Sequence, residues 1–179
     1  MVLANNNRVK ALRADFENGR GAGVYCWWFK EQMAKEILKA IGVTKYANIQ
    51  QKIFDNDTYY ALYFGISKNI DARMYWHICQ HQHGSTLSTL RHTLCGILTA
   101  MGIIIPGNAE TAVNKLIDEN CILEWGFTPN LQTAEQIEGA ELTATTYWYP
   151  LNIQENKSPC TNRKAIKKLR ELRKTAIRI

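Results

Sequence analysis

The sequence predicts an α+β fold in which a small mixed or antiparallel sheet is flanked by helices. Three segments rich in aromatic and β-branched residues predict strands, and roughly six segments with apolar residues at helical spacing predict helices. Two strands come early and helices lie between the strands, which is typical of an α+β domain. The chain has 179 residues, of which 46% are hydrophobic and 21% charged, so one globular domain is expected and a disordered or coiled-coil chain is disfavoured.

The three expected strands cover residues 23–29, 59–66 and 121–127. The first is an apolar and aromatic run, GVYCWWF, and the second, YYALYFGI, is rich in residues that favour strands. The third alternates apolar residues from Leu123 to Phe127, which predicts a strand with one face toward the core.

The expected helices are bounded by capping residues and by residues that end helices. Asn69, Ser85 or Thr86, Thr133 and Asn162 are the predicted N-caps, because their side chains can accept a hydrogen bond from the first helical turn. Gly42 ends one helix. The expected helices cover 30–41, 70–81, about 85–101, a segment from Asn108, a segment from Thr133 to Leu142, and a terminal helix after Asn162.

The net charge of +6 is concentrated at the end of the chain. Residues 157–179 hold nine basic side chains and one acid, for +8, whereas the rest of the chain carries −2. A local basic patch indicates a phosphate, nucleic acid or anionic membrane as partner, with a solvated helix face as the alternative. In the terminal helix Ile166 and Leu169 belong to an apolar stripe, and the basic residues occupy the other faces, which suits salt-sensitive phosphate contacts.

The sequence favours a cytoplasmic protein without a membrane segment. Residues 1–20 lack the apolar core of a secretory signal peptide. The longest apolar run, Leu94 to Ile105, is shorter than the ~20 residues that span a bilayer. The five cysteines form no CxxC pair, which indicates reduced thiols rather than a disulfide framework.

Two tripeptides and one helix carry the candidate chemistry. Gly23-Val24-Tyr25 lies in the first strand and Tyr63-Phe64-Gly65 in the second, while Arg73 and His77 lie four positions apart on the helix that follows. That spacing places a cation and a titratable imidazole on one helix face. Together with Ser67, Asn69, Pro150 and Asn152, this order of residues resembles the GIY-YIG nuclease superfamily.

The resemblance implies a small, three-stranded, mainly antiparallel sheet flanked by helices, and an endonuclease that hydrolyses DNA phosphodiester bonds. It implies that Tyr25 acts as general base or orients the attacking water, and that Tyr63 positions the phosphate or the water. Arg73 would bind non-bridging phosphate oxygens through its planar guanidinium. His77 would relay a proton from Tyr25 or bind the phosphate, and Asn152 would support the site.

A single glutamate is expected to hold a divalent metal ion, Mg²⁺ with Mn²⁺ as the alternative. Counting back nine residues from Pro150, a spacing found in this superfamily, gives Glu141. Matching the local sequence pattern instead gives Glu138, and Glu135 is a third candidate. Glu141 is preferred over Glu138 on the spacing.

The expected substrate is DNA, either duplex or single-stranded, and so small a domain could cut as a homodimer or with a partner. A catalytically inactive nucleic-acid-binding module of the same fold, and a protein-interaction domain that uses the basic helix, are the alternatives. The predicted DNA contacts are Ser67, Lys68 and Arg91, together with Arg163, Lys164, Lys167 and Lys168 of the terminal helix.

The chain is expected to divide into an N-terminal extension (1–21), a catalytic domain (22–156) and a basic C-terminal helix (157–179) packed on that domain. Tyr25 and Tyr63 are 38 positions apart, which is more than in many members of the superfamily and leaves room for a helical insertion at about 30–56. Phe64 also stands where isoleucine is usual. The insertion could reshape the substrate groove, whereas the Phe64 replacement is conservative.

Overall fold

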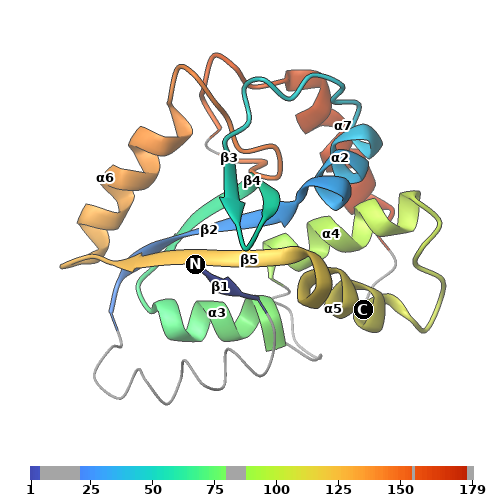
Figure 1. Ribbon diagram of the computed structural model, residues 1–179, viewed down its shortest axis with the longest axis horizontal. Helices are drawn as coiled ribbons and strands as arrows, with labels where there is room; N and C mark the ends of the chain where they lie inside the picture. Colours follow the sequence, from blue (N-terminus) through green and yellow to red (C-terminus); the bar gives the residue numbers. More distant parts are fainter. Residues whose placement is uncertain (5–20, 80–87, 155, 177–179) are drawn as a thin grey trace.

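The computed structural model describes residues 1–4, 21–79, 88–154 and 156–176. The α+β class is confirmed: helices surround a curled sheet (Figure 1). The strands are β1 (Val2–Leu3), β2 (Gly23–Lys30), β3 (Gln51–Phe54), β4 (Asp57–Ser67) and β5 (Cys121–Phe127). The helices are α2 (Glu31–Ala40), α3 (Ile70–Cys79), α4 (Thr89–Ala100), α5 (Ala109–Asn120), α6 (Leu131–Leu142) and α7 (Arg163–Lys174).

The sheet has five strands in the order β1-β5-β2-β4-β3, and every neighbouring pair is antiparallel. The expectation of three strands is therefore wrong in number, although the three expected strands are its three long ones. β2 lies at the centre, where Tyr25 is paired with Gly65 of β4 on one side and with Trp125 of β5 on the other. The two tripeptides thus lie on adjacent strands and meet at the pair of Tyr25 and Gly65.

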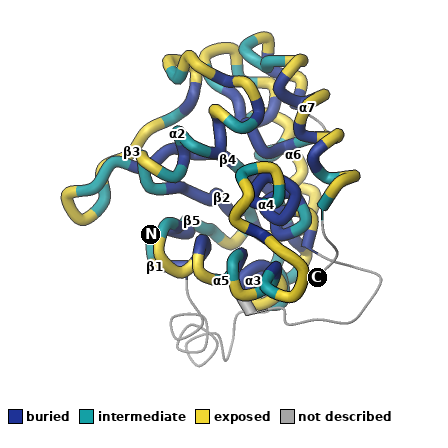
Figure 2. Tube along the Cα trace, turned by 90° about the vertical axis from the view of Figure 1, so that its right-hand side faces the viewer, coloured by how far each residue is buried: buried dark blue, intermediate teal, exposed yellow. Residues whose placement is uncertain are grey.

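The two strands that were not predicted lie at the edges of the sheet. β1 has only two residues, which is too short to show a periodic pattern. β3 is the polar segment QKIF, and its first three residues are exposed, so no buried face marks it in the sequence. Its turn does carry a signal, because Asp55 and Asn56 both adopt positive φ (50° and 64°), as in the two-residue turns that favour Asn and Asp. Figure 2 shows this hairpin projecting from the body with an exposed tip.

The two faces of the sheet carry different amounts of covering structure. On the first face Tyr25, Trp27 and Phe29 pack in the main core, which also includes buried residues of α2, α3, α4, α5 and α7. On the second face Cys26 and Trp28 belong to a smaller cluster, which α6 and the segment after it cover. β2 is therefore buried on both sides, which accounts for its nearly unbroken apolar sequence.

Helix α3 places its residues as the sequence predicts. Ile70, Met74 and Ile78 are at most 2% exposed and form the buried stripe. The Asn69 side-chain oxygen accepts a hydrogen bond from the Ala72 amide and caps the first turn.

Two predicted helix starts need correction or lie outside the described residues. α6 is capped by Asn130, whose side-chain oxygen accepts from the Thr133 amide, so the predicted cap at Thr133 is wrong by one turn. α4 is capped by Ser88, and the predicted caps Ser85 and Thr86 lie outside the described residues.

Helix α7 packs directly on α4. Its buried residues are Ala165, Ile166, Leu169 and Leu172, and its N-cap is Asn162, whose side-chain oxygen accepts from the Lys164 and Ala165 amides. The two helices approach closely at Gly96, where a Cβ atom would lie 2.5 Å from the Leu172 carbonyl oxygen. No helix in the described part of the chain is long and apolar enough to cross a membrane.

Candidate active site

Tyr25, Tyr63 and His77 meet on the first face of the sheet, from β2, β4 and α3. The Tyr25 hydroxyl lies 3.0 Å from Nε2 of His77, within hydrogen-bond distance. The Tyr25 ring centroid is 5.3 Å from that of His77 and 6.3 Å from that of Tyr63. Tyr25 and His77 are buried, and Tyr63 is half-buried, so Tyr63 is the member of the group that solvent reaches.

The second nitrogen of His77 is also held. Its Nδ1 lies 2.5 Å from Oγ of Ser88, the N-cap of α4, and that oxygen also accepts from the Arg91 amide. Burial, followed by the charges of Arg73 and Arg91, lowers the pKa of His77 to about 3. His77 is therefore a neutral imidazole at neutral pH, with one nitrogen donating and the other accepting.

The two tyrosine hydroxyls remain protonated in this environment. Burial raises the pKa of Tyr25 well above its ordinary value, and it also raises the pKa of Tyr63. After burial the two tyrosines affect each other most, because Tyr63 raises the pKa of Tyr25 and Tyr25 lowers the pKa of Tyr63. Three charged side chains act in addition: Arg73 lowers both pKa values, Arg173 lowers the pKa of Tyr63, and Glu138 raises both. Charged groups from three helices thus act together at these hydroxyls.

The glycines of the two tripeptides are required by close packing. A Cβ atom at Gly65 would lie 2.6 Å from the Tyr25 hydroxyl oxygen, because the Tyr25 ring lies over its β4 neighbour. A Cβ atom at Gly23 would lie 2.2 Å from the Gly126 carbonyl oxygen and 2.8 Å from Ile70, at the start of α3. The glycines therefore allow the ring and the helix to approach the sheet.

Asn152 completes the edge of β4 where β3 no longer covers it. Its side-chain oxygen accepts from the Phe64 amide at 2.9 Å, and its nitrogen donates to the Phe64 carbonyl at 2.8 Å. The Leu151 amide donates to the carbonyl of Leu62, which precedes Phe64 by two residues on β4. A buried side chain thus replaces a neighbouring strand next to Tyr63 and satisfies two backbone groups that burial would otherwise leave unpaired.

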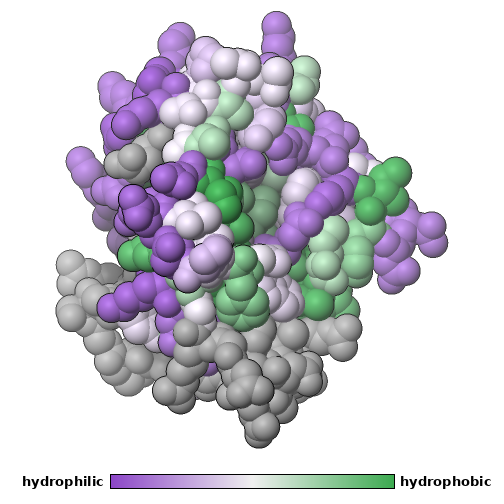
Figure 3. All heavy atoms as spheres, turned by 90° about the vertical axis from the view of Figure 1, so that its left-hand side faces the viewer, coloured by the Kyte–Doolittle hydropathy of each residue, from purple (hydrophilic) through white to green (hydrophobic). Residues whose placement is uncertain are grey.

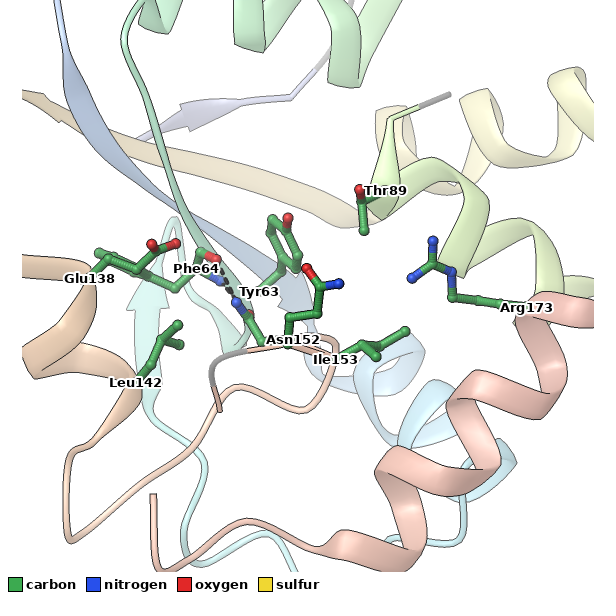
Figure 4. Close-up of a pocket in the computed structure, with 9 residues that line it drawn as sticks. Tyr63, Phe64, Thr89, Glu138, Leu142, Asn152, Ile153 and Arg173 are labelled. Carbon is green, nitrogen blue, oxygen red and sulfur yellow. Dashed lines mark hydrogen bonds between the residues drawn. The ribbon is translucent and has the colours of Figure 1, made fainter. Parts of the chain in front are cut away.

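A polar pocket of about 280 Å³ opens beside Tyr63. Its lining includes Tyr63 of β4, Glu138 of α6 and Arg173 of α7, together with Asn152 from the segment between α6 and α7 (Figure 4). A neighbouring pocket of about 480 Å³ is lined by Ser67, Lys68, Arg73 and Glu135, among others. Glu135 and Glu138 lie one turn apart on α6, so this helix contributes a carboxylate to each pocket. The face of the molecule on the side of α6 carries hydrophilic side chains interspersed with hydrophobic patches (Figure 3).

Glu141 lies in a different environment, on the second face of the sheet. Its Oε2 accepts hydrogen bonds from the hydroxyls of Tyr147 at 2.8 Å and Tyr149 at 2.6 Å. It lines a pocket with Cys26 and Glu124, away from the pocket that holds Tyr63 and Glu138. The structure therefore brings Glu138, and not Glu141, to the pocket beside Tyr63.

The predicted DNA contacts fall into three groups. Ser67 is buried and shapes the turn into α3, where its hydroxyl accepts from the Asn69 amide and donates to the Asn69 carbonyl, while Lys68 is exposed. Arg91 is only 1% exposed, and its guanidinium donates to the His77 carbonyl and to the side chain of Asn114. The expected phosphate contact by Arg91 is therefore corrected: this cation ties α3 and α5 to α4. The predicted contacts in α7 are all exposed: Arg163, Lys164, Lys167 and Lys168.

Two residues of the site were missed from the sequence. Ser88 had a signal, because a serine before the apolar run of α4 is a normal N-cap, although its contact with His77 depends on tertiary packing. Arg173 had a weak one, because helical spacing from Ile166 and Leu169 places either Leu172 or Arg173 on the inward stripe, but nothing distinguished it from the eight other basic residues near the end of the chain. Its place in the pocket follows from the packing of α7 on α4.

No cluster of three or more His, Cys, Asp or Glu side chains that could hold a metal ion is present in the part of the chain that the structure describes. A site with a single carboxylate is compatible with this finding, because Mg²⁺ often keeps several waters and takes its other ligands from substrate phosphates.

Comparison with known proteins gives one informative match. No curated protein and no solved structure matches the chain significantly. Among protein families, the GIY-YIG catalytic domain matches residues 23–175, which include both tripeptides, α3, α6 and all of α7. On this match over most of its length, the chain belongs to the GIY-YIG nuclease superfamily, whose members are generally hydrolytic endonucleases.

Proposed function

We propose that this protein is a metal-dependent endonuclease that hydrolyses phosphodiester bonds in DNA. The observation that carries the proposal is the hydrogen bond between the Tyr25 hydroxyl and Nε2 of a neutral, buried His77, next to the pocket that Tyr63 and Glu138 line. Such a pair can move a proton to or from a reacting water without burying a net charge in the resting state. The family match supports the same reaction class.

In this proposal Tyr25 orients the attacking water and exchanges protons with it. As the water oxygen forms its bond to phosphorus, the bond between phosphorus and the leaving DNA oxygen breaks, and that oxygen takes a proton from solvent. In the same step one water proton passes to the Tyr25 oxygen and the Tyr25 proton passes to Nε2 of His77, from which it returns through Tyr25 to solvent once the products have left. This direction requires Nδ1–H of His77 to donate to Ser88. The negative charge of a bound phosphate opposes the effect of Arg73 and Arg91, and therefore raises the pKa of His77 toward a range in which it can hold the proton.

Arg73 is assigned to the non-bridging oxygens of the phosphate. It lies one turn before His77 on α3 and lines the pocket beside Ser67 and Lys68. Its guanidinium carbon is 5.6 Å from the ring centroid of Trp76, a distance at which the ring can help to hold the cation in place. A planar guanidinium can then donate two parallel hydrogen bonds to the phosphate.

Glu138 is assigned as the carboxylate that holds the metal ion, in place of Glu141. It lines the pocket with Tyr63 and Asn152, whereas Glu141 lines a different pocket on the other face. Oxygen ligands of this kind fit Mg²⁺ and also Mn²⁺. When bound, a divalent cation supplies charge stabilisation at the phosphate oxygens and lowers the pKa of a coordinated water.

Four exposed cations in the first half of α7, together with Lys68, are assigned to the DNA backbone. Arg163, Lys164, Lys167 and Lys168 lie on the face of α7 that points away from α4. Exposed lysines and arginines contact phosphates without reading bases, so this part of the interaction should be salt-dependent and independent of sequence.

A pair of matched tyrosine variants tests the proposal. Purified wild-type protein, Tyr25→Phe and Tyr149→Phe are incubated with plasmid, linear duplex and single-stranded DNA, in Mg²⁺ or in EDTA. Both variants remove one buried hydroxyl and keep the ring, but only Tyr25 lies beside His77. We expect Mg²⁺-dependent cleavage by the wild type and by Tyr149→Phe, and little or none by Tyr25→Phe.

Other results would contradict the proposal in distinct ways. Binding without cleavage by the wild type would indicate an inactive binding module, and neither binding nor cleavage would leave the protein-interaction alternative. Equal cleavage in all three preparations would reveal a contaminating nuclease.

A further inference from the structure

We infer that Arg173, near the end of α7, is a second phosphate-binding arginine of the active site, a role that rests on the proposed function. Through Arg173, the terminal helix would take part in catalysis as well as in general DNA binding. The net charge of the terminal segment does not distinguish Arg173 from the other basic residues of this helix.

The position of Arg173 separates it from the other cations of α7. It lines the pocket beside Tyr63, whereas Arg163, Lys164, Lys167 and Lys168 are exposed and lie outside that pocket. Figure 4 shows its guanidinium directed into the pocket from the side opposite Glu138, with Tyr63 and Asn152 between them.

The electrostatics agree with this position. Partial burial lowers the pKa of Arg173 from its ordinary value, and its charge acts on Tyr63 to lower the pKa of that phenol. A guanidinium nitrogen of Arg173 lies 3.4 Å from Nδ1 of His92. Arg173 takes part in none of the ion pairs formed among the described residues. A cation that has lost part of its hydration without gaining a carboxylate is well placed to bind an anion.

The backbone of α7 next to Arg173 is held firmly against α4. It directly follows Leu172, whose carbonyl oxygen lies against Gly96 of α4, and Leu172 and Leu169 are both buried in the main core. The helix crossing thus fixes the point from which the Arg173 side chain leaves α7 toward the pocket, and a catalytic donor benefits from such a fixed origin.

Arg173 and Glu138 would hold the same phosphate from opposite sides. A cation bound at Glu138 would draw phosphate oxygens to one wall of the pocket, and the guanidinium fork of Arg173 could donate to oxygens at the other. As the water attacks, negative charge accumulates on these oxygens, and a fixed cation then stabilises the transition state more than the ground state.

Three variants of the full-length protein test the inference: Arg173→Ala, Arg173→Lys and Lys174→Ala. Lys174 is the next residue of the helix and is exposed, so its variant removes the same unit of charge outside the pocket. Single-turnover cleavage at saturating DNA in Mg²⁺ should fall about 100-fold in Arg173→Ala, less in Arg173→Lys, and stay at the wild-type rate in Lys174→Ala. Added guanidinium ion should restore part of the rate of Arg173→Ala only, which a purely structural role would not produce.

The outcomes separate this inference from the proposed function. If the wild type cleaves and Arg173→Ala cleaves at the same rate, the inference is overturned and the nuclease assignment stands. If the wild type cleaves nothing, the proposed function fails, and fluorescence anisotropy with labelled DNA decides whether Arg173 still contacts phosphate more strongly than Lys174 does; equal losses overturn that contact. Should Arg173→Ala fail to fold by thermal melting, Arg173→Gln, which keeps the aliphatic stem, replaces it in every measurement.

Discussion

The two faces of the central sheet each carry tyrosine hydroxyls bonded to a titratable side chain, but the two networks differ in charge. On the first face Tyr25 is bonded to His77, which is neutral because burial lowers its pKa to about 3. On the second face Tyr147 and Tyr149 both donate to the carboxylate of Glu141. The first network is neutral at rest and can accept a proton at His77, whereas the second fixes two donors on one anion.

The surroundings of the two networks reinforce this difference. On the second face burial, aided by the hydrogen bond to Glu141, raises the pKa of Tyr147 to about 12, so that this hydroxyl stays a donor. On the first face Tyr63 reaches a pocket in which Glu138 and Arg173 supply opposite charges. These differences support placing the proposed chemistry on the first face, while the second face holds two phenols on one carboxylate.

The largest expected effect on the cleavage rate comes from replacing Glu138 by glutamine, with the same replacement of Glu141 as the comparison. Glu138→Gln should reduce Mg²⁺-dependent cleavage on the order of 100- to 1,000-fold, because the pocket loses its charged metal ligand. Glu141→Gln should leave the cleavage rate near that of the wild type and lower the free energy of unfolding by about 1–3 kcal/mol, because two charge-assisted hydrogen bonds weaken. Single-turnover kinetics and urea unfolding measure both. The opposite ranking of the two variants in cleavage would return the metal to Glu141.

The next effect separates a crowded glycine from an uncrowded one. Gly65→Ala should lower the free energy of unfolding by about 3 kcal/mol and reduce cleavage, because the new methyl group would displace the Tyr25 ring from His77. Gly126→Ala is the matched control in the sheet, since no atom lies within 4 Å of a Cβ built there. Urea unfolding of both variants, with circular dichroism, measures the difference. Equal stability of the two would mean that the Tyr25 ring is not confined by Gly65.

The sequence predicts those parts of the molecule that are governed by periodicity and local capping. The stripe Ile70, Met74 and Ile78 and the cap at Asn69 follow from helix geometry alone, and the alternation in the third strand identifies β5. The outer end of β5 departs from the prediction, because Phe127 is 48% exposed instead of facing the core.

The parts that could not be predicted depend on contacts between segments far apart in the chain. Glu138 and Glu141 are three positions apart on one helix, and only the packing of α6 decides that the first reaches Tyr63 and the second reaches Tyr149. The sequence predicts a DNA contact at Arg91, whereas in the structure its buried guanidinium donates to groups of α3 and α5. A helix-face pattern cannot distinguish these outcomes, because it does not specify the neighbouring element.

Protonation of His77 in the unfolded chain should lower the free energy of unfolding by about 2 kcal/mol at pH 5. Its folded pKa of about 3 is below the unfolded value of about 6.5, so below pH 6.5 the unfolded chain binds a proton that the folded protein does not. The resulting stability is complete above pH 6.5 and is lost as the pH falls, by about 2 kcal/mol at pH 5. In His77→Gln this loss is absent, so the stability difference between wild type and variant should narrow by that amount between pH 7 and pH 5. Urea unfolding at both pH values checks this, and parallel pH curves for the two proteins would show that His77 is not buried as a neutral group.

The smallest expected effect lies on the second face, where Lys52 pairs with Glu124 at 2.6 Å and both side chains are about 40% exposed (42% and 39%). An ion pair this exposed contributes little, because water and salt screen it, so Lys52→Met should change the free energy of unfolding by less than about 1 kcal/mol. The methionine keeps an apolar stem over the Trp28 ring, and Glu124 keeps its hydrogen bond from Trp28. The small loss should disappear in high salt, as urea unfolding at two salt concentrations would measure, and the cleavage rate should not change. A large fall in cleavage would show that charges on the second face reach the reaction, and the two faces would then have to be treated as one electrostatic unit.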